Sequence, residues 1–127
     1  PTLYDQDIQQ LMESFSFVPT SSLVTTSITV NGTLYKKGMH VILQCDENGA
    51  LFGEIIMFII DGQETVHFIT RKQKATYEPY IGVYKLHGIS EGLTCIQFDK
   101  LLDYYPLPAY SVQNSVYICL HHAVIDQ

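Results

Sequence analysis

The sequence from residue 23 onward is divided into short runs of β-branched and aromatic residues by pairs of turn-forming residues. The clearest turns are Asn31-Gly32 and Asp61-Gly62, because these residue types tolerate the positive φ angles of two-residue hairpin loops. Seven or eight such runs follow one another at short spacing. This pattern predicts antiparallel strands joined by tight turns and argues against alternating βαβ units.

One run, residues 51–60, is strongly apolar but too short to span a bilayer, so it indicates a buried strand. Gly53 near its start indicates a bulge or a sharp bend. Because closure removes exposed sheet edges, we expect an all-β fold, a small antiparallel barrel that is closed or half closed. We also expect a polar loop at residues 72–79. Strands are expected after it at residues 81–87, 93–98 and 116–120.

The segment that precedes the strands contains one short helix candidate, residues 5–15. Asp5 or Asp7 can cap its first turn, and its apolar residues recur at helical spacing: Ile8, Leu11, Met12 and Phe15. A helix this short is marginal alone in water, so we expect it to pack on the rest of the protein. The length of 127 residues fits one domain, with a helix and linker over 1–22 packed on a β-barrel over 23–127.

The sequence has no recognisable motif for catalysis, metal binding or a disulfide framework. Structural zinc sites use closely spaced pairs of ligands, and among the three cysteines and five histidines only Cys119-x-His121 resembles a pair. Cys45 could act as a nucleophile with a distant histidine, but no nucleophile elbow and no glycine-rich phosphate loop is present. We therefore predict a protein that is not an enzyme and that holds no metal or cofactor. The cysteine pattern favours a reducing, intracellular compartment.

Three segments occur in an order that is similar to known β domains. A Gly-led strand at Gly38–Leu43 and a Phe-Gly-Glu-Ile run at residues 52–55 resemble the opening of SH3-like barrels such as Tudor and BAH modules. Together with the LDYYPLPAY segment at residues 102–110, they look like the C-terminal β domain of uncharacterised, transposon-related animal proteins. The resemblance covers residues 28–125 and implies an intracellular, nuclear protein without catalytic residues. It also implies recognition of peptides or modified side chains, although a shared fold does not establish a shared function.

Tyrosines in two segments form the candidate binding site for a protein or peptide partner. Loops at one end of a barrel could bring several rings together around a cation, as in methyl-lysine cages, and Glu78 and Asp103 would add complementary charge. The alternative is that the rings cover the ends of the barrel with their hydroxyl groups in water. The candidate residues are Tyr77, Tyr80, Tyr84, Tyr104, Tyr105 and Tyr110.

Two other functions remain open. The net charge of −6 disfavours general nucleic-acid binding, yet five of the seven basic residues lie in two short runs that could form a local patch, Lys36, Lys37, Arg71, Lys72 and Lys74. The same residues could instead be solvated loop charges. Self-association through the N-terminal helix or an open sheet edge is the third function. We predict a protein-interaction module of a larger chromatin- or transposon-associated protein that does not bind membranes, with nucleic-acid binding and homo-oligomerisation as alternatives.

Overall fold

A computed structural model describes residues 22–47 and 49–119, and it shows a mainly β protein built from antiparallel sheets. The prediction of an antiparallel β fold is confirmed. The helix predicted at residues 5–15 and the end of the strand predicted at 116–120 lie outside the described residues. The elements are β1 (Leu23–Thr25), β2 (Ser27–Val30), β3 (Thr33–Lys36), β4 (His40–Asp46), β5 (Gly49–Ile60), β6 (Val66–Glu78), β7 (Val83–Gln97), the 3₁₀ turn η2 (Phe98–Lys100), β8 (Ala109–Val112) and β9 (Ser115–Ile118).

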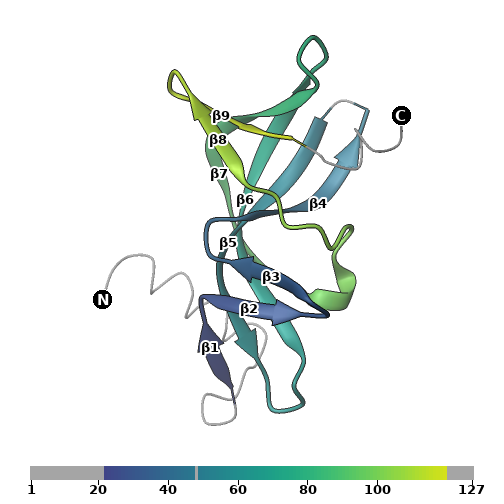
Figure 1. The fold of residues 1–127 in the computed structure, drawn as a ribbon, viewed down its shortest axis with the longest axis vertical. Coiled ribbons are helices and arrows are strands. Elements are labelled where there is room, and N and C mark those ends of the chain that lie inside the picture. The colour runs from purple at the N-terminus through teal and green to yellow at the C-terminus, as the bar shows by residue number, and fades with distance from the viewer. Residues whose placement is uncertain (1–21, 48, 120–127) are drawn as a thin grey trace.

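The long strands β5, β6 and β7 run through the whole molecule, and shorter strands surround them at each end (Figure 1). The main sheet has the order β1-β5-β6-β7-β9-β8. β4 pairs with the first half of β5, and β1 pairs with the end of β5 on the same edge of that strand. The β2–β3 hairpin is a separate two-stranded sheet. We call the end with β4, β8 and β9 the upper half and the end with β1, β2 and β3 the lower half.

The sequence suggested a barrel that is closed or half closed, and the described strands do not form a closed one. β4 and β8 lie at the two open edges of the upper half. Among the described residues, an isolated bridge between His40 of β4 and Leu107, which precedes β8, joins these edges. The two backbone hydrogen bonds of this bridge have N···O distances of 2.7 and 2.8 Å. The edges stay apart because Pro106 and Pro108 flank Leu107, and proline has no N–H group to extend a ladder.

The polar segment 72–79, predicted to be a loop, is largely the second half of β6. It pairs with β5 on one side and β7 on the other, so tertiary pairing overrides its polar composition. The two strands predicted at 81–87 and 93–98 are one strand, β7, which is 15 residues long. Gly88 and Gly92 have φ angles of 83° and 100°, which allow β7 to bend and still continue as one strand.

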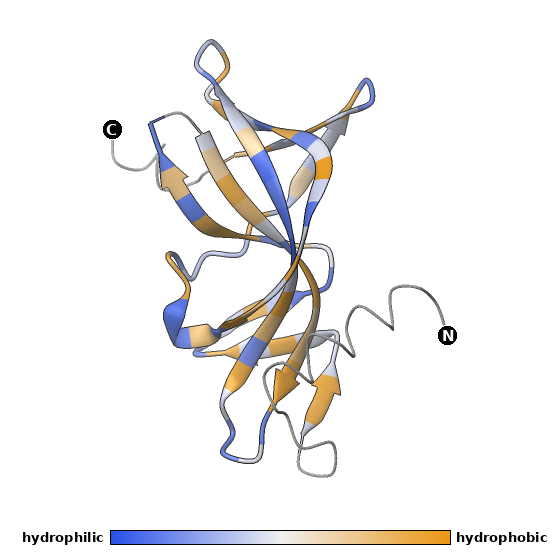
Figure 2. Cartoon of the chain, turned by 180° about the vertical axis from the view of Figure 1, so that it is seen from behind, coloured by the Kyte–Doolittle hydropathy of each residue, from blue (hydrophilic) through white to orange (hydrophobic). Residues whose placement is uncertain are grey.

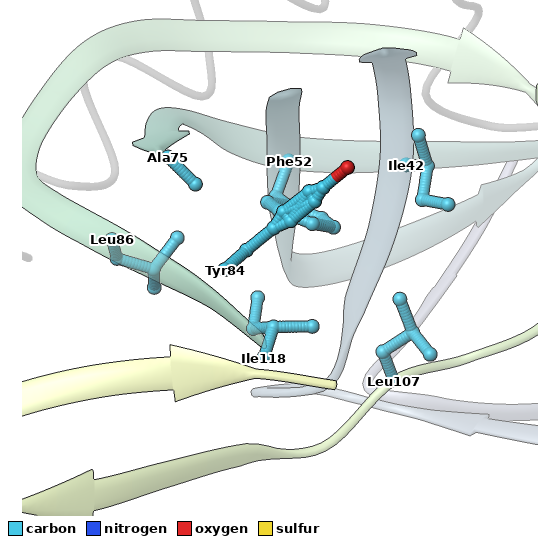
Figure 3. Packing of buried hydrophobic residues seen from close by; sticks show 7 residues of the cluster. All are labelled: Ile42, Phe52, Ala75, Tyr84, Leu86, Leu107 and Ile118. Atoms are coloured by element: carbon cyan, nitrogen blue, oxygen red, sulfur yellow. The ribbon is translucent and has the colours of Figure 1, made fainter. Parts of the chain in front are cut away.

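Buried side chains form three clusters. The upper cluster lies inside the curved sheet and contains Ile42, Phe52, Ala75, Tyr84, Leu86, Leu107 and Ile118 (Figure 3). The lower cluster lies beneath the β2–β3 hairpin and contains Tyr35, Val41, Ile55, Phe58, Phe68 and Leu101. A third cluster, Ile56, Ile59 and Ile69, belongs to β5 and β6. The bend between the halves follows a register shift between Ile55 and Met57, close to the bend predicted at Gly53.

Candidate functional site

A pocket of about 300 Å³ opens at the outer end of the upper half. The end of β4, the β6–β7 hairpin and the end of β9 surround it. Its wall combines aromatic and aliphatic side chains with two carboxylates: Tyr77, Val83, Tyr84, Ile118, Asp46 and Glu47. We call this site the aromatic pocket.

The β6–β7 hairpin places the two rings of the pocket side by side. Tyr77 and Tyr84 are direct partners in the ladder, so their side chains project from the same face of the sheet. Their ring centroids are 5.2 Å apart and their planes are inclined by 56°. The turn that joins the strands is closed by hydrogen bonds from the N–H groups of Ile81 and Gly82 to the carbonyl oxygen of Glu78. Gly82 adopts a φ of 69°, which the turn requires.

The two rings differ in how firmly they are held. Tyr84 is buried in the upper core, where its ring meets Phe52 edge to face at 5.5 Å (Figure 3). Tyr77 is 45% exposed and so presents ring surface to solvent. Tyr84 therefore forms a fixed wall of the aromatic pocket, and Tyr77 forms the part of the wall that an incoming ligand would touch.

The carboxylates of the pocket come from the turn after β4. The N–H of Gly49 donates a hydrogen bond of 3.1 Å to Asp46 Oδ1, which fixes the shape of this turn. Burial, with a contact from Cys45 Sγ at 3.5 Å and the nearby negative charge of Asp46, raises the pKa of Tyr84 to about 12. The phenol thus stays neutral while Asp46 and Glu47 carry negative charge beside it. An electron-rich ring face next to carboxylates attracts a cation.

The six predicted tyrosines are divided among several places. Tyr77 and Tyr84 share the aromatic pocket, and Tyr80 stands fully exposed in the turn of the same hairpin. Tyr104 stacks on Phe98 at 4.9 Å, and its carbonyl oxygen accepts a hydrogen bond from the Tyr35 hydroxyl. The exposed pair Tyr104 and Tyr105 and the β8 residue Tyr110 are not part of the pocket wall.

The acidic partners of the rings also differ from the predicted pair. The aromatic pocket is lined by Asp46 and Glu47, whereas the sequence suggested Glu78 and Asp103 as neighbours of the tyrosines. Asp103 instead accepts a hydrogen bond of 3.0 Å from the N–H of Tyr105. Glu78 and Asp103 were expected because they are close to the tyrosines along the chain, whereas the end of β4 reaches Tyr84 through the curvature of the sheet.

The basic residues are spread over two regions that β5 separates. Arg71, Lys72 and Lys74 lie on β6. Lys36 is the last residue of β3 and Lys37 follows it, on the other side of β5, where the N–H of Gly38 donates a hydrogen bond to the carbonyl oxygen of Ile55. Two of the β6 residues have acidic partners. Arg71 Nη1 lies 3.3 Å from Glu54 Oε1, and Lys74 Nζ lies 3.9 Å from Glu91 Oε1. These contacts reduce the positive charge that the β6 run presents.

The two hypotheses of a Cys45 nucleophile and of a metal site can be compared with the described residues. Cys45 and His87 line the same cavity of about 320 Å³, but the ring of His87 hydrogen-bonds to Thr76 Oγ1 at 2.6 Å and Cys45 contacts Tyr84. Neither contact directs His87 toward the thiol as a base. Across residues 22–47 and 49–119, no three His, Cys, Asp or Glu residues are grouped to hold a metal ion. In the same part of the chain, no helix has the length and apolar character needed to cross a membrane.

Comparison of the chain with protein-family models, with curated protein sequences and with solved structures found no match in any of the three. The resemblance to SH3-like barrels and to transposon-related proteins therefore stays a prediction. The aromatic pocket is the feature of the described residues from which a function can be inferred.

Proposed function

We propose that this domain is a non-catalytic protein-interaction module that binds a cationic side chain of its partner, a lysine or methylated lysine, in the aromatic pocket. The observation that carries the proposal is the meeting of the Tyr77–Tyr84 ring pair with Asp46 and Glu47 around one cavity. A cation beside these groups gains attraction from the ring faces and from the carboxylates together. The overall charge of −6 also favours a basic partner.

The size of the pocket supports a single side chain as its occupant. Its volume of about 300 Å³ lies at the lower end of the range of ligand pockets, so it fits a side chain better than a folded surface. Among the described residues, two rings line it. We therefore propose recognition of an ammonium group by this ring pair together with the carboxylates of the same wall.

The proposal also covers the cellular setting and the finer fold. We propose a nuclear module of a larger chromatin- or transposon-associated protein, as the resemblance over residues 28–125 implies. The upper half supports a relation to half-closed SH3-like barrels, because its strands curve around one core and its edges approach at His40 and Leu107. A test of the setting is the location of a fluorescently tagged full-length parent protein in cells.

The binding test is an NMR titration of the ring protons of Tyr77 and Tyr84 with short glycine-flanked peptides that carry one trimethyl-lysine. Tyr77→Ala should weaken binding by about 3- to 30-fold, because a cation–π contact contributes about 0.5–2 kcal/mol. Tyr77→Phe keeps the ring and should bind nearly as well as the original protein. Glu47→Gln should weaken binding and make it less sensitive to salt.

Two controls test whether binding depends on the aromatic pocket and on the positive charge of the peptide. Tyr110→Ala removes an exposed tyrosine that lies outside the pocket, so it should leave binding unchanged. A peptide whose quaternary nitrogen is replaced by carbon has the same shape without the charge and should lose most of its affinity. Equal binding of the charged and neutral peptides would refute the proposal.

Nucleic-acid binding and self-association are tested with the same protein. The nucleic-acid alternative would be favoured if single-stranded RNA binds tightly at low salt and is released at high salt. Lys36→Ala and Lys37→Ala should then reduce RNA binding, because they remove charge from one of the basic runs. A doubled mass in light scattering without ligand would favour pairing through an open sheet edge.

A further inference from the structure

The outer edge of β4 connects the His40–Leu107 bridge with the aromatic pocket. At one end, His40 forms the bridge through backbone groups on the side of β4 that faces away from β5. At the other end, Asp46 belongs to the wall of the aromatic pocket. Among residues 22–47 and 49–119, β5 is the strand that pairs with β4 along its length. Between the bridge and the pocket, the described part of the chain thus places no further strand on this edge.

Backbone groups of β4 point outward along this edge. In an antiparallel strand, the N–H and carbonyl groups of one residue point to one side, and those of the next residue point to the other. Because His40 uses its groups for the bridge to Leu107, those of Ile42 also point away from β5. The register shift after Ile42 adds one residue, so the next outward groups are those of Cys45. Such a row of backbone groups is a template for an added strand.

A cavity of about 400 Å³ lies along the same edge. In the described part of the chain, four consecutive residues of β4, 43–46, line it together with Leu102. A cavity over one face of the sheet would be lined by alternate residues of β4 and by residues of β5, since successive side chains point to opposite faces. The lining therefore places this cavity against the edge of β4, and we call it the edge groove.

The segment that follows η2 forms the far wall of the edge groove. Figure 1 shows this segment passing beside β4 before it reaches the bridge at Leu107. Figure 2 shows apolar residues in the first half of β4 and again where the chain leaves η2. Leu102 lines the groove and is 61% exposed, so its side chain keeps free apolar surface. This surface is available to a side chain of a strand that lies on the edge.

The edge groove is continuous with the aromatic pocket, because Asp46 lines both. The contact of 3.5 Å between Cys45 Sγ and the Tyr84 hydroxyl also joins the edge to the wall of the pocket. The stretch from Ile42 to Asp46 extends over about 13 Å, so a short extended peptide on this edge would reach the pocket. A lysine at that end of the peptide would meet the carboxylates of Asp46 and Glu47, whose charge is complementary.

We infer that the partner binds as an extended peptide that adds a β-strand to the outer edge of β4, with its lysine in the aromatic pocket and a neighbouring apolar side chain beside Leu102. In this mode of recognition, main-chain hydrogen bonds supply affinity and pockets for side chains supply specificity. The inference rests on the proposed function, because the lysine fixes one end of the added strand. It defines the partner as an extended segment and not as a lysine on a folded surface.

Methylation of single backbone amides of the peptide tests the added strand. The probe is Gly-Val-Thr-Lys-Val-Thr-Gly with a trimethylated lysine, and its affinity is measured by calorimetry. A methyl group on an amide that faces β4 removes a hydrogen bond and introduces a clash, so it should weaken binding by about tenfold or more. On an amide that faces away from β4 it should leave the affinity unchanged. The loss should therefore recur at every second position, and equal effects at all positions would overturn the inference.

Two measurements on the protein give the same decision. The peptide should slow hydrogen exchange of the Ile42 amide by about tenfold or more, while the Val41 amide, which faces β5, should change little. Leu102→Ser should weaken binding by about 3- to 10-fold, because it removes apolar surface from the edge groove. Leu34→Ser alters an exposed leucine of β3 that does not line the groove and should leave binding unchanged.

The ring protons of Tyr77 separate failure of this inference from failure of the proposed function. If they shift with the peptide while exchange at Ile42 stays the same and methylation shows no alternation, the lysine occupies the pocket without an added strand. That result overturns the inference and leaves the proposed function in place. If the ring protons do not shift, the proposed function is refuted and the inference is refuted with it.

Discussion

Replacement of Phe68 by alanine should strongly destabilise the protein, because this side chain joins the two sheets of the lower half. Phe68 is 0% exposed. Its ring lies 5.2 Å from that of Tyr35, which belongs to the separate β2–β3 hairpin, and 4.8 Å from that of Phe58, both edge to face. It also contacts the ring of Phe98 at 6.1 Å. Phe68 is thus one of the buried side chains through which the hairpin packs on the main sheet.

The magnitude follows from the buried ring. Truncation of a buried phenylalanine costs about 3–5 kcal/mol, which combines lost transfer free energy with the cavity that remains. Each edge-to-face contact accounts for about 0.5–1.5 kcal/mol beyond the buried area. The free energy of unfolding of a domain this size is about 5–15 kcal/mol, so Phe68→Ala should remove a large fraction of it.

Urea unfolding followed by circular dichroism measures this effect. Phe68→Leu keeps most of the volume but loses the two edge-to-face contacts, so its cost should be about 1–3 kcal/mol and lower than that of Phe68→Ala. Leu34→Ala is the matched control on β3, because Leu34 is exposed and its truncation should change stability by at most about 0.5 kcal/mol. A loss below about 1 kcal/mol for Phe68→Ala would refute the view that the lower cluster holds the hairpin to the sheet.

Two further predictions concern backbone packing and pH. Gly53→Ala should cost about 1–3 kcal/mol in thermal or urea unfolding, because the added Cβ would lie 2.7 Å from Thr70 Oγ1 and 2.8 Å from Thr70 Cβ; an unchanged stability would contradict this close approach of β5 and β6. Hydrogen bonds from His67, Thr65 and Gln63 lower the pKa of the Asp61 carboxyl, so its stabilisation is present above the unfolded-state pKa and is lost as pH falls through the lower folded-state pKa. Asp61→Asn should therefore flatten the dependence of Tm on pH below about pH 4. If the curve of Tm against pH for the variant runs parallel to that of the original protein, this assignment is contradicted.

The composition and the turn residues determined the class of fold. Asn31 and Gly32 adopt the positive φ angles, 51° and 83°, that the hairpin prediction required. The β-branched and aromatic runs form antiparallel strands because such side chains pack well on a pleated surface. These are local properties of the chain, so sequence reasoning could reach them without knowledge of the three-dimensional arrangement.

The errors fall where long-range pairing competes with local preference. Residues 72–79 are polar and were expected to be a loop, but residues 72–75 pair with β5 and most of residues 73–78 pair with β7, so all but the last residue belong to a strand. The exposed face of this strand accepts the polar side chains. The sequence left barrel closure open, because closure depends on whether the edge of β4 meets the chain around β8; in the described part of the chain, an isolated bridge between His40 and Leu107 joins them.

The sequence predicted which residue types would line the candidate site, tyrosines and carboxylates, but it did not predict which of these residues come together. The sequence singled out Tyr77 and Tyr84 as part of a larger set, and the register of β6 and β7 brings these two together. Asp46 and Glu47 joined them only through the curvature of the sheet, which carries the end of β4 to the β6–β7 hairpin.

The sequence by itself determined the antiparallel β class, the Asn31-Gly32 turn and the residue types available for binding, because side-chain propensity and turn geometry act over a few residues. The tertiary structure alone decided which face of each long strand is buried. A register shift within β5 and the bend of β7 turn the sheet so that the upper and lower halves bury different clusters. Residues far apart in the chain share a pocket for this reason, since their distance depends on the summed twist of several strands.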